Sequence, residues 1–367
     1  MTIEDLALTF VPHLGVRGTV HLLDVYGSVE RIFAASESDL AERAQLRTDI
    51  ARSIVRRAGF AEAEREMKHC SRHGIEIVAS TDAAYPEFMR TAADYPHILY
   101  MKGDASALRS PHVLSIVGTR KMTSYGERVC NEIVEAIAAE FPDAVIVSGL
   151  AFGSDAAAHR AALAFGLRTV GVVANALPDI VPAQNGALAR DMIARGGAVV
   201  TEVTSQTKQN GNLYIPRNRI IAALGEGLLV IESPANGGSM STVAAADAYS
   251  REIMAVPGRT TDTMSVGTNS LIRNRVAQMV VSAADVISCL GWTASAVPER
   301  VHAEMREPTA CERRLLDCFP ESGDAVAFDE LVVRSGLAAG ETAARLLDLE
   351  LSGDVRCLPG KMYEKLR

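Results

Sequence analysis

The stretch VLSIVGTRKMTSYGERVCNEIVEAIAAEFPDAVIVSG, residues 113–149, runs from a β-branched segment through a glycine and a helical pattern to a second β-branched segment and glycine. Similar segments follow as TVGVVA (169–174), AVVTE (198–202), LLVIE (228–232) and IMAVP (253–257). Strands that alternate with helices of 10–15 residues predict βαβ units and a parallel sheet. Residues 75–291 are therefore expected to form a Rossmann-like, doubly wound, mostly parallel α/β domain.

Both flanks of this region have other patterns. Residues 1–74 are helical in character, and the Gly15/Gly18 pair in HLGVRGTVHLLDVYGSVERIF (13–33) suggests a helix-hairpin-helix (SAM-like) turn. A small helical bundle with glycine turns is the alternative, and we expect a structural or interaction role for this region. Residues 292–308 form a polar, proline-containing linker. Residues 309–367 show three helical patterns and a hairpin around Pro359-Gly360, which predicts a winged-helix-like domain.

Composition limits the class of protein. The net charge is −8 and 48% of residues are hydrophobic, which is ordinary for a globular chain and counts against non-specific nucleic-acid coating. None of the six cysteines forms a CxxC pair, so we expect reduced thiols, no metal site and no cofactor. The acidic N-terminus is unlike a signal peptide, and no apolar run reaches the roughly 18 residues of a membrane span. A cytoplasmic protein with no membrane partner is expected.

Four of the predicted strands end in segments rich in glycine and hydroxyl residues. They read SIVGTRKMTSYG (115–126), IVSGLAFGSDAAAH (146–159), IESPANGGSMST (231–242) and AVPGRTTD (255–262). Right-handed crossovers place these strand ends on one edge of the sheet, where open α/β sheets bind ligands. Glycine lets the backbone approach an anion, and the amides of the next helix N-terminus point at it. A phosphate-type ligand is favoured over turn formation alone.

Basic residues lie beside these segments. Arg120 follows the first glycine, and Arg217, Asn218 and Arg219 begin a helical pattern in NLYIPRNRIIAAL (212–224). Arg217 and Arg219 point to different sides of a helical turn, so at most one or two of the three can face one groove. Tyr214 either stacks on a base or packs at the edge of the core.

Other motifs are missing or ambiguous. No G-x-G-x-x-G follows the first strand, and there is no G-x-x-x-x-G-K-[ST], so neither an NAD site nor a P-loop is supported. Asp155 and His159 stand at i, i+4 and could form an acid/base pair or half a metal site. We favour an aspartate that orients the histidine, because no further histidine or carboxylate cluster accompanies them.

The order of the motifs resembles the DNA-processing protein A family (DprA/Smf). The resemblance covers residues 75–281 and rests on YP (85–86), PHILYMKG (96–103), SIVGTR, VSGLAFGSDAAAHRAAL, IPRNRII, GGSMST, AVPG and GTNSLI (267–272). It implies an extended Rossmann fold, a homodimer that binds single-stranded DNA and helps load a RecA-type recombinase in natural transformation, and no catalysis. It places DNA phosphates near Gly118, Thr119, Arg120, Ser148, Gly149, Arg217, Asn218, Arg219, Gly238, Ser239, Ser241 and Thr242.

The chain departs from the family pattern at several positions. Phe152-Gly153-Ser154-Asp155 stands where Arg-Gly-Ile-Asp is common, so one basic residue is lost. Ala174 and Ala176 replace common glycines, and Pro178 replaces a common aspartate. We therefore expect the 174–185 loop to contribute little to binding.

Two other functions compete with DNA binding. GGSMSTVAAAD (237–247) is similar to the GGxGTxxE loop of Rossmann-like phosphoribohydrolases, but Ala245 stands where the catalytic glutamate is expected. The protein could also be a scaffold whose tail recruits a partner. The third helical pattern of the tail carries Glu341, Asp348 and Glu350 against Arg345, so the tail is predicted to contact protein rather than DNA.

Overall fold

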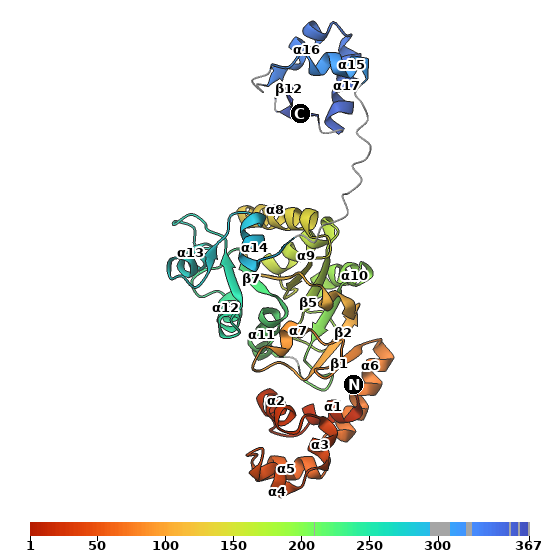
Figure 1. Cartoon of the computed structure of the whole chain (residues 1–367), viewed down its shortest axis with the longest axis vertical. Helices are drawn as coiled ribbons and strands as arrows, with labels where there is room; N and C mark the ends of the chain where they lie inside the picture. The colour runs from red at the N-terminus through yellow and green to blue at the C-terminus, as the bar shows by residue number, and fades with distance from the viewer. Residues whose placement is uncertain (209, 294–308, 321–324, 352–353, 359, 366–367) are drawn as a thin grey trace. The chain divides into compact units, whose positions relative to one another are not determined.

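The structure is a computed structural model that describes residues 1–208, 210–293, 309–320, 325–351, 354–358 and 360–365. Two compact units are present, Met1–Ala294 and Ser295–Arg367 (Figure 1). The first unit contains the helical N-terminal region and the large sheet. The second is the small C-terminal region.

The first unit is built on a nine-stranded sheet with the order β1-β2-β6-β5-β4-β3-β7-β8-β9. The strands are β1 (Glu76–Ala79), β2 (Ile98–Gly103), β3 (Val113–Val117), β4 (Val145–Ser148), β5 (Arg168–Val172), β6 (Ala198–Thr201), β7 (Gly227–Val230), β8 (Glu252–Ala255) and β9 (Gln278–Met279). Neighbours from β6 to β9 pair in parallel, whereas β2 is antiparallel to both β1 and β6. The six predicted parallel strands are confirmed; β1, β2 and β9 were not predicted.

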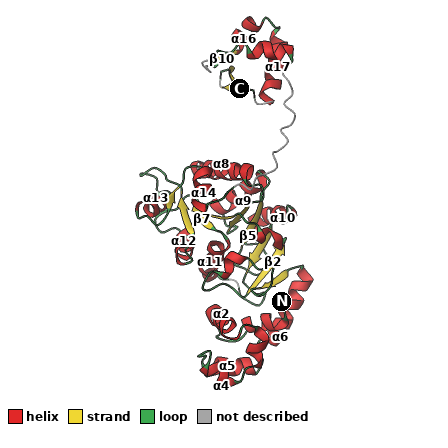
Figure 2. Ribbon diagram, in the orientation of Figure 1, coloured by secondary structure: helices red, strands yellow, loops and turns green. Residues whose placement is uncertain are grey.

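Helices cover both faces of this sheet (Figure 2). On one face, α8 (Ser124–Glu140), α9 (Ser154–Ala164) and α14 (Ala283–Leu290) pack against Leu114 and Ile116 of β3. On the other, α11 (Tyr214–Leu224), α12 (Ser239–Ala248) and α13 (Val266–Arg273) belong to the cluster that contains Val113 and Val117. Alternate residues of β3 thus face opposite layers, and the expected doubly wound mostly parallel sheet is confirmed.

The strand order reverses at β3. From β3 the chain moves outward through β4, β5 and β6, with α10 (Gly186–Ala194) between the last two, and then returns to β7 on the other side of β3. The connections that follow β3 and β7 therefore leave the sheet edge in opposite directions. Such a switch point opens a crevice at the carboxyl ends of the strands.

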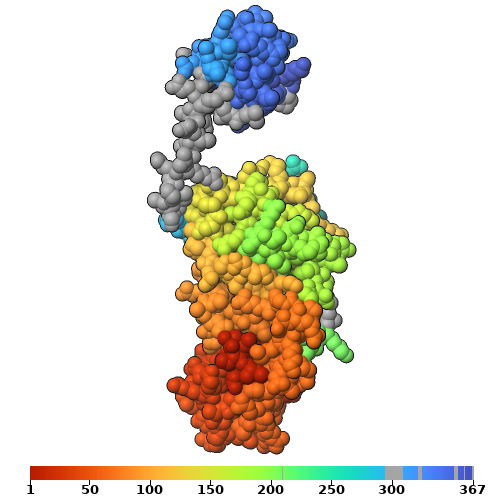
Figure 3. Space-filling model, turned by 90° about the vertical axis from the view of Figure 1, so that its right-hand side faces the viewer, coloured from red at the N-terminus to blue at the C-terminus, as the bar shows by residue number. Residues whose placement is uncertain are grey.

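The N-terminal helices form a bundle at the β1 end of the sheet (Figure 1), and their residues, in red and orange, make up one end of the first unit in Figure 3. They are α1 (Ile3–Thr9), α2 (Gly15–Tyr26), α3 (Val29–Ala34), α4 (Glu37–Glu42), α5 (Thr48–Val55) and α6 (Phe60–His73). Leu6 of α1 and Cys70 of α6 pack with Tyr100 of β2. Gly15 starts α2 with a φ of 64°, whereas Gly18 lies inside α2. Only the first glycine of the pair therefore makes a turn, and the region is a small helical bundle.

The C-terminal unit has the elements of a winged helix. It contains α15 (Ala310–Leu316), α16 (Phe328–Ser335) and α17 (Ala339–Leu351) with a sheet of order β10-β12-β11, made by Val326–Ala327, Met362–Lys365 and Val355–Leu358. Leu315, Leu331 and Leu346 form its core. The predicted three helices and hairpin are confirmed. Most of the predicted linker (294–308) and Pro359 of the predicted turn lie outside the described residues.

Shorter elements complete the description: α7 (Glu87–Arg90) and the 3-10 turns Ala105–Arg109, Ala183–Asn185 and Gly211–Leu213. Within the described residues no helix is long and apolar enough to cross a bilayer. The same residues contain no group of three or more potential metal ligands.

Candidate nucleic-acid interface

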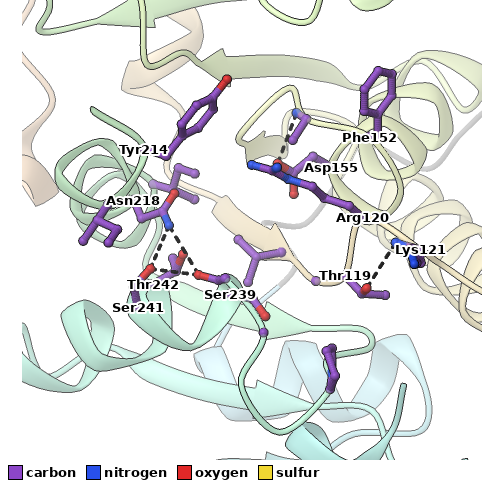
Figure 4. A pocket seen from close by; sticks show the side chains of 18 of the residues that line it. Thr119, Arg120, Lys121, Phe152, Asp155, Tyr214, Asn218, Ser239, Ser241 and Thr242 are labelled. Atoms are coloured by element: carbon purple, nitrogen blue, oxygen red, sulfur yellow. Dashed lines mark hydrogen bonds between the residues drawn. The ribbon is translucent and has the colours of Figure 1, made fainter. Parts of the chain in front are cut away.

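A cavity of about 730 Å³ opens at the switch point, between the ends of β3 and β7 (Figure 4). The segment after β3, the loop before α9, and the first turns of α11 and α12 surround it. Ten of the predicted site residues line it: Gly118, Thr119, Arg120, Tyr214, Arg217, Asn218, Gly238, Ser239, Ser241 and Thr242. Segments about 120 residues apart in the chain thus meet as the parallel sheet predicts.

The start of α12 is arranged as an anion site. Gly238 precedes the helix, no side chain caps it, and its first turn contains no acidic residue. The first amides of a helix have no intrahelical acceptor and carry the positive end of the dipole. Asn218 donates through Nδ2 to Ser241 Oγ at 2.8 Å, which ties α11 to this turn. The N-terminus of α12 is therefore held in place by α11, and no acidic side chain in its own first turn compensates its positive end.

Two exposed cations stand at the mouth of the cavity. Arg120 is exposed, with its Cζ 5.3 Å from the ring centroid of Tyr214, and Lys121 follows it on the cavity wall. The amide of Lys121 donates to Thr119 Oγ1 at 3.1 Å, which fixes the turn after β3. Sequence reasoning missed Lys121, although its place directly after Arg120 was a usable signal. It also missed three apolar residues that line the cavity, Phe152, Ile215 and Met264.

Arg217 has a different role from Arg120. Its side chain is buried, and its guanidinium donates to the backbone carbonyls of Gly149 and Val172 at the ends of β4 and β5. Burial lowers the pKa of Arg217, and the neighbouring Asp155 opposes that shift. Arg217 therefore holds strand ends together beneath the cavity. The exposed charge available to a ligand comes from Arg120 and Lys121.

Three predicted site residues do not reach the cavity. Ser148 is fully buried and donates to the carbonyl of Ile116 at 2.6 Å. Gly149 offers its carbonyl to Arg217. Arg219 forms an ion pair with Glu202 and donates to the carbonyl of Asp94 at 2.6 Å. Arg217 and Arg219 lie about 200° apart around the helix, so only Arg217 of the two lines the cavity. This agrees with the prediction that at most one or two of Arg217, Asn218 and Arg219 face one groove.

Asp155 and His159 form hydrogen bonds with different partners. Asp155 lines the cavity and accepts the amide of Ala151 at 3.2 Å, and burial raises its pKa. His159 is fully buried, with Nδ1 2.6 Å from Thr169 Oγ1 and no partner at Nε2. Thr169 gives its own proton to the carbonyl of Ile146, so His159 Nδ1 must be the donor. The hypothesis that Asp155 orients His159 is wrong, because Thr169 does so.

The phosphoribohydrolase hypothesis lacks its carboxylate in the structure. Ala245 packs against the hydrophobic core at the position where that enzyme class has glutamate. Asp247 is exposed and lines a separate cavity with Arg251 and Arg275. The two-residue displacement has turned the acid away from the switch point, as expected from helical geometry.

A buried carboxylate lies on the α8 side of the site. Glu232, directly after β7, accepts the amide of Thr123 at 2.8 Å and its hydroxyl at 2.6 Å. Glu232 is fully buried, and a Cβ on Gly126 would lie 2.5 Å from its carboxylate. The end of β7 is therefore bound tightly to the start of α8.

The other predicted loops lie outside this cavity. Gly258 lines a second cavity with Tyr125, Arg128 and Arg259. No residue of the 174–185 loop is among those that line the first cavity. Asn185 instead donates to the carbonyls of Leu150 and Ala151, at 2.8 and 3.1 Å, and so supports the loop before α9.

Comparisons with known proteins agree with this architecture. The chain is 32% identical over 296 residues to Protein Smf of Escherichia coli, covering 79% of this chain and 77% of that protein. It is 29% identical over 338 residues to a putative DNA processing protein DprA of Mycobacterium tuberculosis, covering 88% and 86%.

Two solved structures are similar. DNA processing protein A from Streptococcus pneumoniae superposes with a TM-score of 0.68 at 27% identity, covering 78% of this chain and 98% of that one. DNA processing protein A from Helicobacter pylori, described for its single-stranded DNA binding mode, gives 0.53 at 27% identity, covering 60% and 97%. The family profile described as DNA recombination-mediator protein A matches residues 76–291, and the DprA winged helix domain matches residues 302–361. The chain therefore belongs to the DNA recombination-mediator protein A family.

Proposed function

We propose that this protein binds single-stranded DNA in the switch-point cavity as a DNA-processing protein of natural transformation. The observation that carries the proposal is the meeting of Arg120 and Lys121 with the unmatched N-terminus of α12 in one cavity. Basic groups beside aromatic side chains are the usual composition of a single-strand groove, and Tyr214 supplies a ring here. The DNA-binding mode described for the Helicobacter pylori relative supports the same function.

The phosphates are assigned to two segments. One is Gly118–Arg120 with Lys121, and the other is Gly238–Thr242. With two exposed cations in the cavity, the slope of log K against log salt should be about −1.4 for each occupied site. A small slope fits a chain whose net charge is −8.

Fluorescence anisotropy with labelled oligo(dT), measured across a salt series, tests this function. The double variant Arg120→Glu/Lys121→Glu should lose binding, and double-stranded DNA should bind more weakly than oligo(dT) to the unaltered protein. Arg56→Glu/Lys68→Glu is the charge-matched control, because both residues are exposed in the N-terminal helical region and neither lines the cavity. Normal binding by the double variant would overturn the assignment.

We propose two partners in addition to DNA: a second copy of the chain and a RecA-type recombinase. The edge strand β9 supports a homodimer, because Val276, Met279 and Val281 expose 40%, 57% and 63% of their surface beside it. An unpaired strand edge with apolar neighbours is suited to self-association. Light scattering should give a dimer that Met279→Glu converts to a monomer. The unaltered protein should speed the nucleation of the recombinase on single-stranded DNA. The double variant Arg120→Glu/Lys121→Glu should leave the nucleation rate at its value without the protein.

We further propose that the protein works in the cytoplasm and catalyses no reaction at this cavity. The recombinase and the incoming DNA strand would meet in the cytoplasm. Free cysteines such as Cys70 and Cys130 would stay reduced in that compartment. A nucleotide-hydrolysis assay with AMP, run beside the anisotropy measurement, checks the second statement. Release of free base that depends on Asp155 would overturn it.

A further inference from the structure

An exposed aromatic ring stands on the wall of the cavity opposite Tyr214. Phe152 exposes 45% of its surface, although it lies between the fully buried Leu150 and the tightly packed Gly153. In Figure 4 the rings of Phe152 and Tyr214 lie on opposite sides of Arg120. Ile215, which follows Tyr214 in α11 and is 70% exposed, adds a further apolar side chain to the cavity lining.

The backbone on both sides of Phe152 is fixed. Ala151 donates its amide to Asp155 Oδ2 at 3.2 Å and accepts from Asn185 at 3.1 Å. A Cβ on Gly153 would lie 2.3 Å from the carbonyl oxygen of Thr119, so this glycine is pressed against the Thr119–Arg120 segment. The backbone that carries Phe152 is therefore held in place, and its side chain is exposed on the cavity lining.

The two rings of the cavity differ in their contacts. Tyr214 has the guanidinium carbons of Arg120 and Arg217 at 5.3 and 5.8 Å from its centroid. Among residues 1–208 and 210–293, Phe152 has no aromatic or cationic partner for its ring. An aromatic side chain has only two χ angles, so it loses little conformational entropy when a flat ligand covers it.

We propose that Phe152 stacks on a nucleobase of the bound strand, so that part of the affinity comes from the base rather than the phosphates. This inference rests on the proposed function and adds a base-contacting residue to the same site. Arg120 and Lys121 hold the backbone, and the ring takes one base from the strand that they hold. Every base has an aromatic face, so the contact tolerates different sequences.

The consequence is a separation of two contributions to binding. Phe152→Ala should weaken oligo(dT) binding by roughly 5- to 160-fold, the range expected for loss of one stacked base. The slope of log K against log salt should not change, because no charge is removed. Phe152→Trp should bind oligo(dT) at least as well as the unaltered protein. Phe152→Leu should lose most of the affinity that the aromatic ring contributes.

An oligonucleotide of the same length with abasic sites provides the decisive comparison, because it keeps the phosphates and removes the bases. The unaltered protein should bind it more weakly than oligo(dT), and Phe152→Ala should cause no further loss. Val55→Ala, at a 44% exposed position on α5, is the control for loss of an exposed apolar side chain. Thermal unfolding checks that every variant is folded.

The possible failures are distinguishable. If Phe152→Ala binds oligo(dT) normally, or loses equal affinity for abasic DNA, the stacking role is overturned while the DNA site stands. If Arg120→Glu/Lys121→Glu also binds normally, or the unaltered protein does not bind oligo(dT), the proposed function fails and this inference fails with it.

Discussion

The buried guanidinium of Arg217 donates a hydrogen bond to the backbone carbonyl of Gly149, across 68 residues of sequence. It also carries the charge that faces the buried Asp155. Arg217→Met should therefore lower the free energy of unfolding by about 3–5 kcal/mol, because one member of a buried charged pair is removed. Urea unfolding measures this loss. Arg120→Met should leave stability unchanged and weaken DNA binding, and the opposite pattern would contradict both assignments.

A second pair of variants separates backbone strain from ligand contact. Gly153 has a φ of 71° and no room for a Cβ, so Gly153→Ala should cost at least about 1–3 kcal/mol of stability. Gly238 has nothing within 4 Å of an added Cβ. Gly238→Ala should leave unfolding unchanged and weaken oligo(dT) binding where a phosphate approaches the backbone. Unchanged binding would remove Gly238 from the phosphate site.

His159 should make stability depend on pH. Burial first, and then Arg217 and Arg160, lower the pKa of His159 to about 3. The unfolded chain takes up this proton near pH 6.5 and the folded protein only near pH 3, so stability is lost as pH falls through that window. The loss should approach about 1.4 kcal/mol per pH unit. His159→Gln should flatten the dependence between pH 4 and 6, and the exposed His13→Asn should retain it.

The C-terminal unit should be dispensable for DNA affinity. Glu341, Asp348 and Glu350 lie on or near the surface of α17, and its Arg345 forms an ion pair with Asp348 at 3.2 Å. A helix of this charge is poorly suited to a phosphate backbone. The chain ending at residue 298 should bind oligo(dT) within about twofold of the full chain by anisotropy. If this shortened chain loses most of its affinity for oligo(dT), the prediction that the C-terminal unit contacts protein rather than DNA is contradicted.

The sequence predicted the parallel strands well, because their β-branched segments are buried on both faces and stand out from the helices. It did not predict β1 and β2. The strands pair antiparallel, and the four-residue β1 lies at the edge and is buried in only half of its length, so it lacks the continuous apolar segment of the parallel strands. It also placed ten site residues on one cavity, because parallel strands bring all their carboxyl ends to one edge.

Side-chain roles were harder to predict than positions. Arg120 and Arg217 look equivalent in the sequence, since both are arginines beside glycine or a helix start. The structure separates them by burial: Arg120 is exposed, and Arg217 donates to carbonyls of β4 and β5. Likewise, the spacing of Asp155 and His159 suggested a pair, but Thr169, from the neighbouring strand β5, binds the imidazole. Such partners depend on tertiary packing that spacing alone does not encode.

The carboxylate of Glu232 limits which helix N-termini at this sheet edge can receive a phosphate. It occupies the amide of Thr123 at the start of the 17-residue helix α8, and Asp155 stands in the first turn of α9. Two of the helices that begin at this sheet edge thus already have an anion from the protein itself. The first turn of α12 contains none. The chain's own carboxylates thus compete with a ligand for the starts of α8 and α9, and the start of α12 is the one left to receive a phosphate, in the cavity that the exposed Arg120 and Lys121 also line.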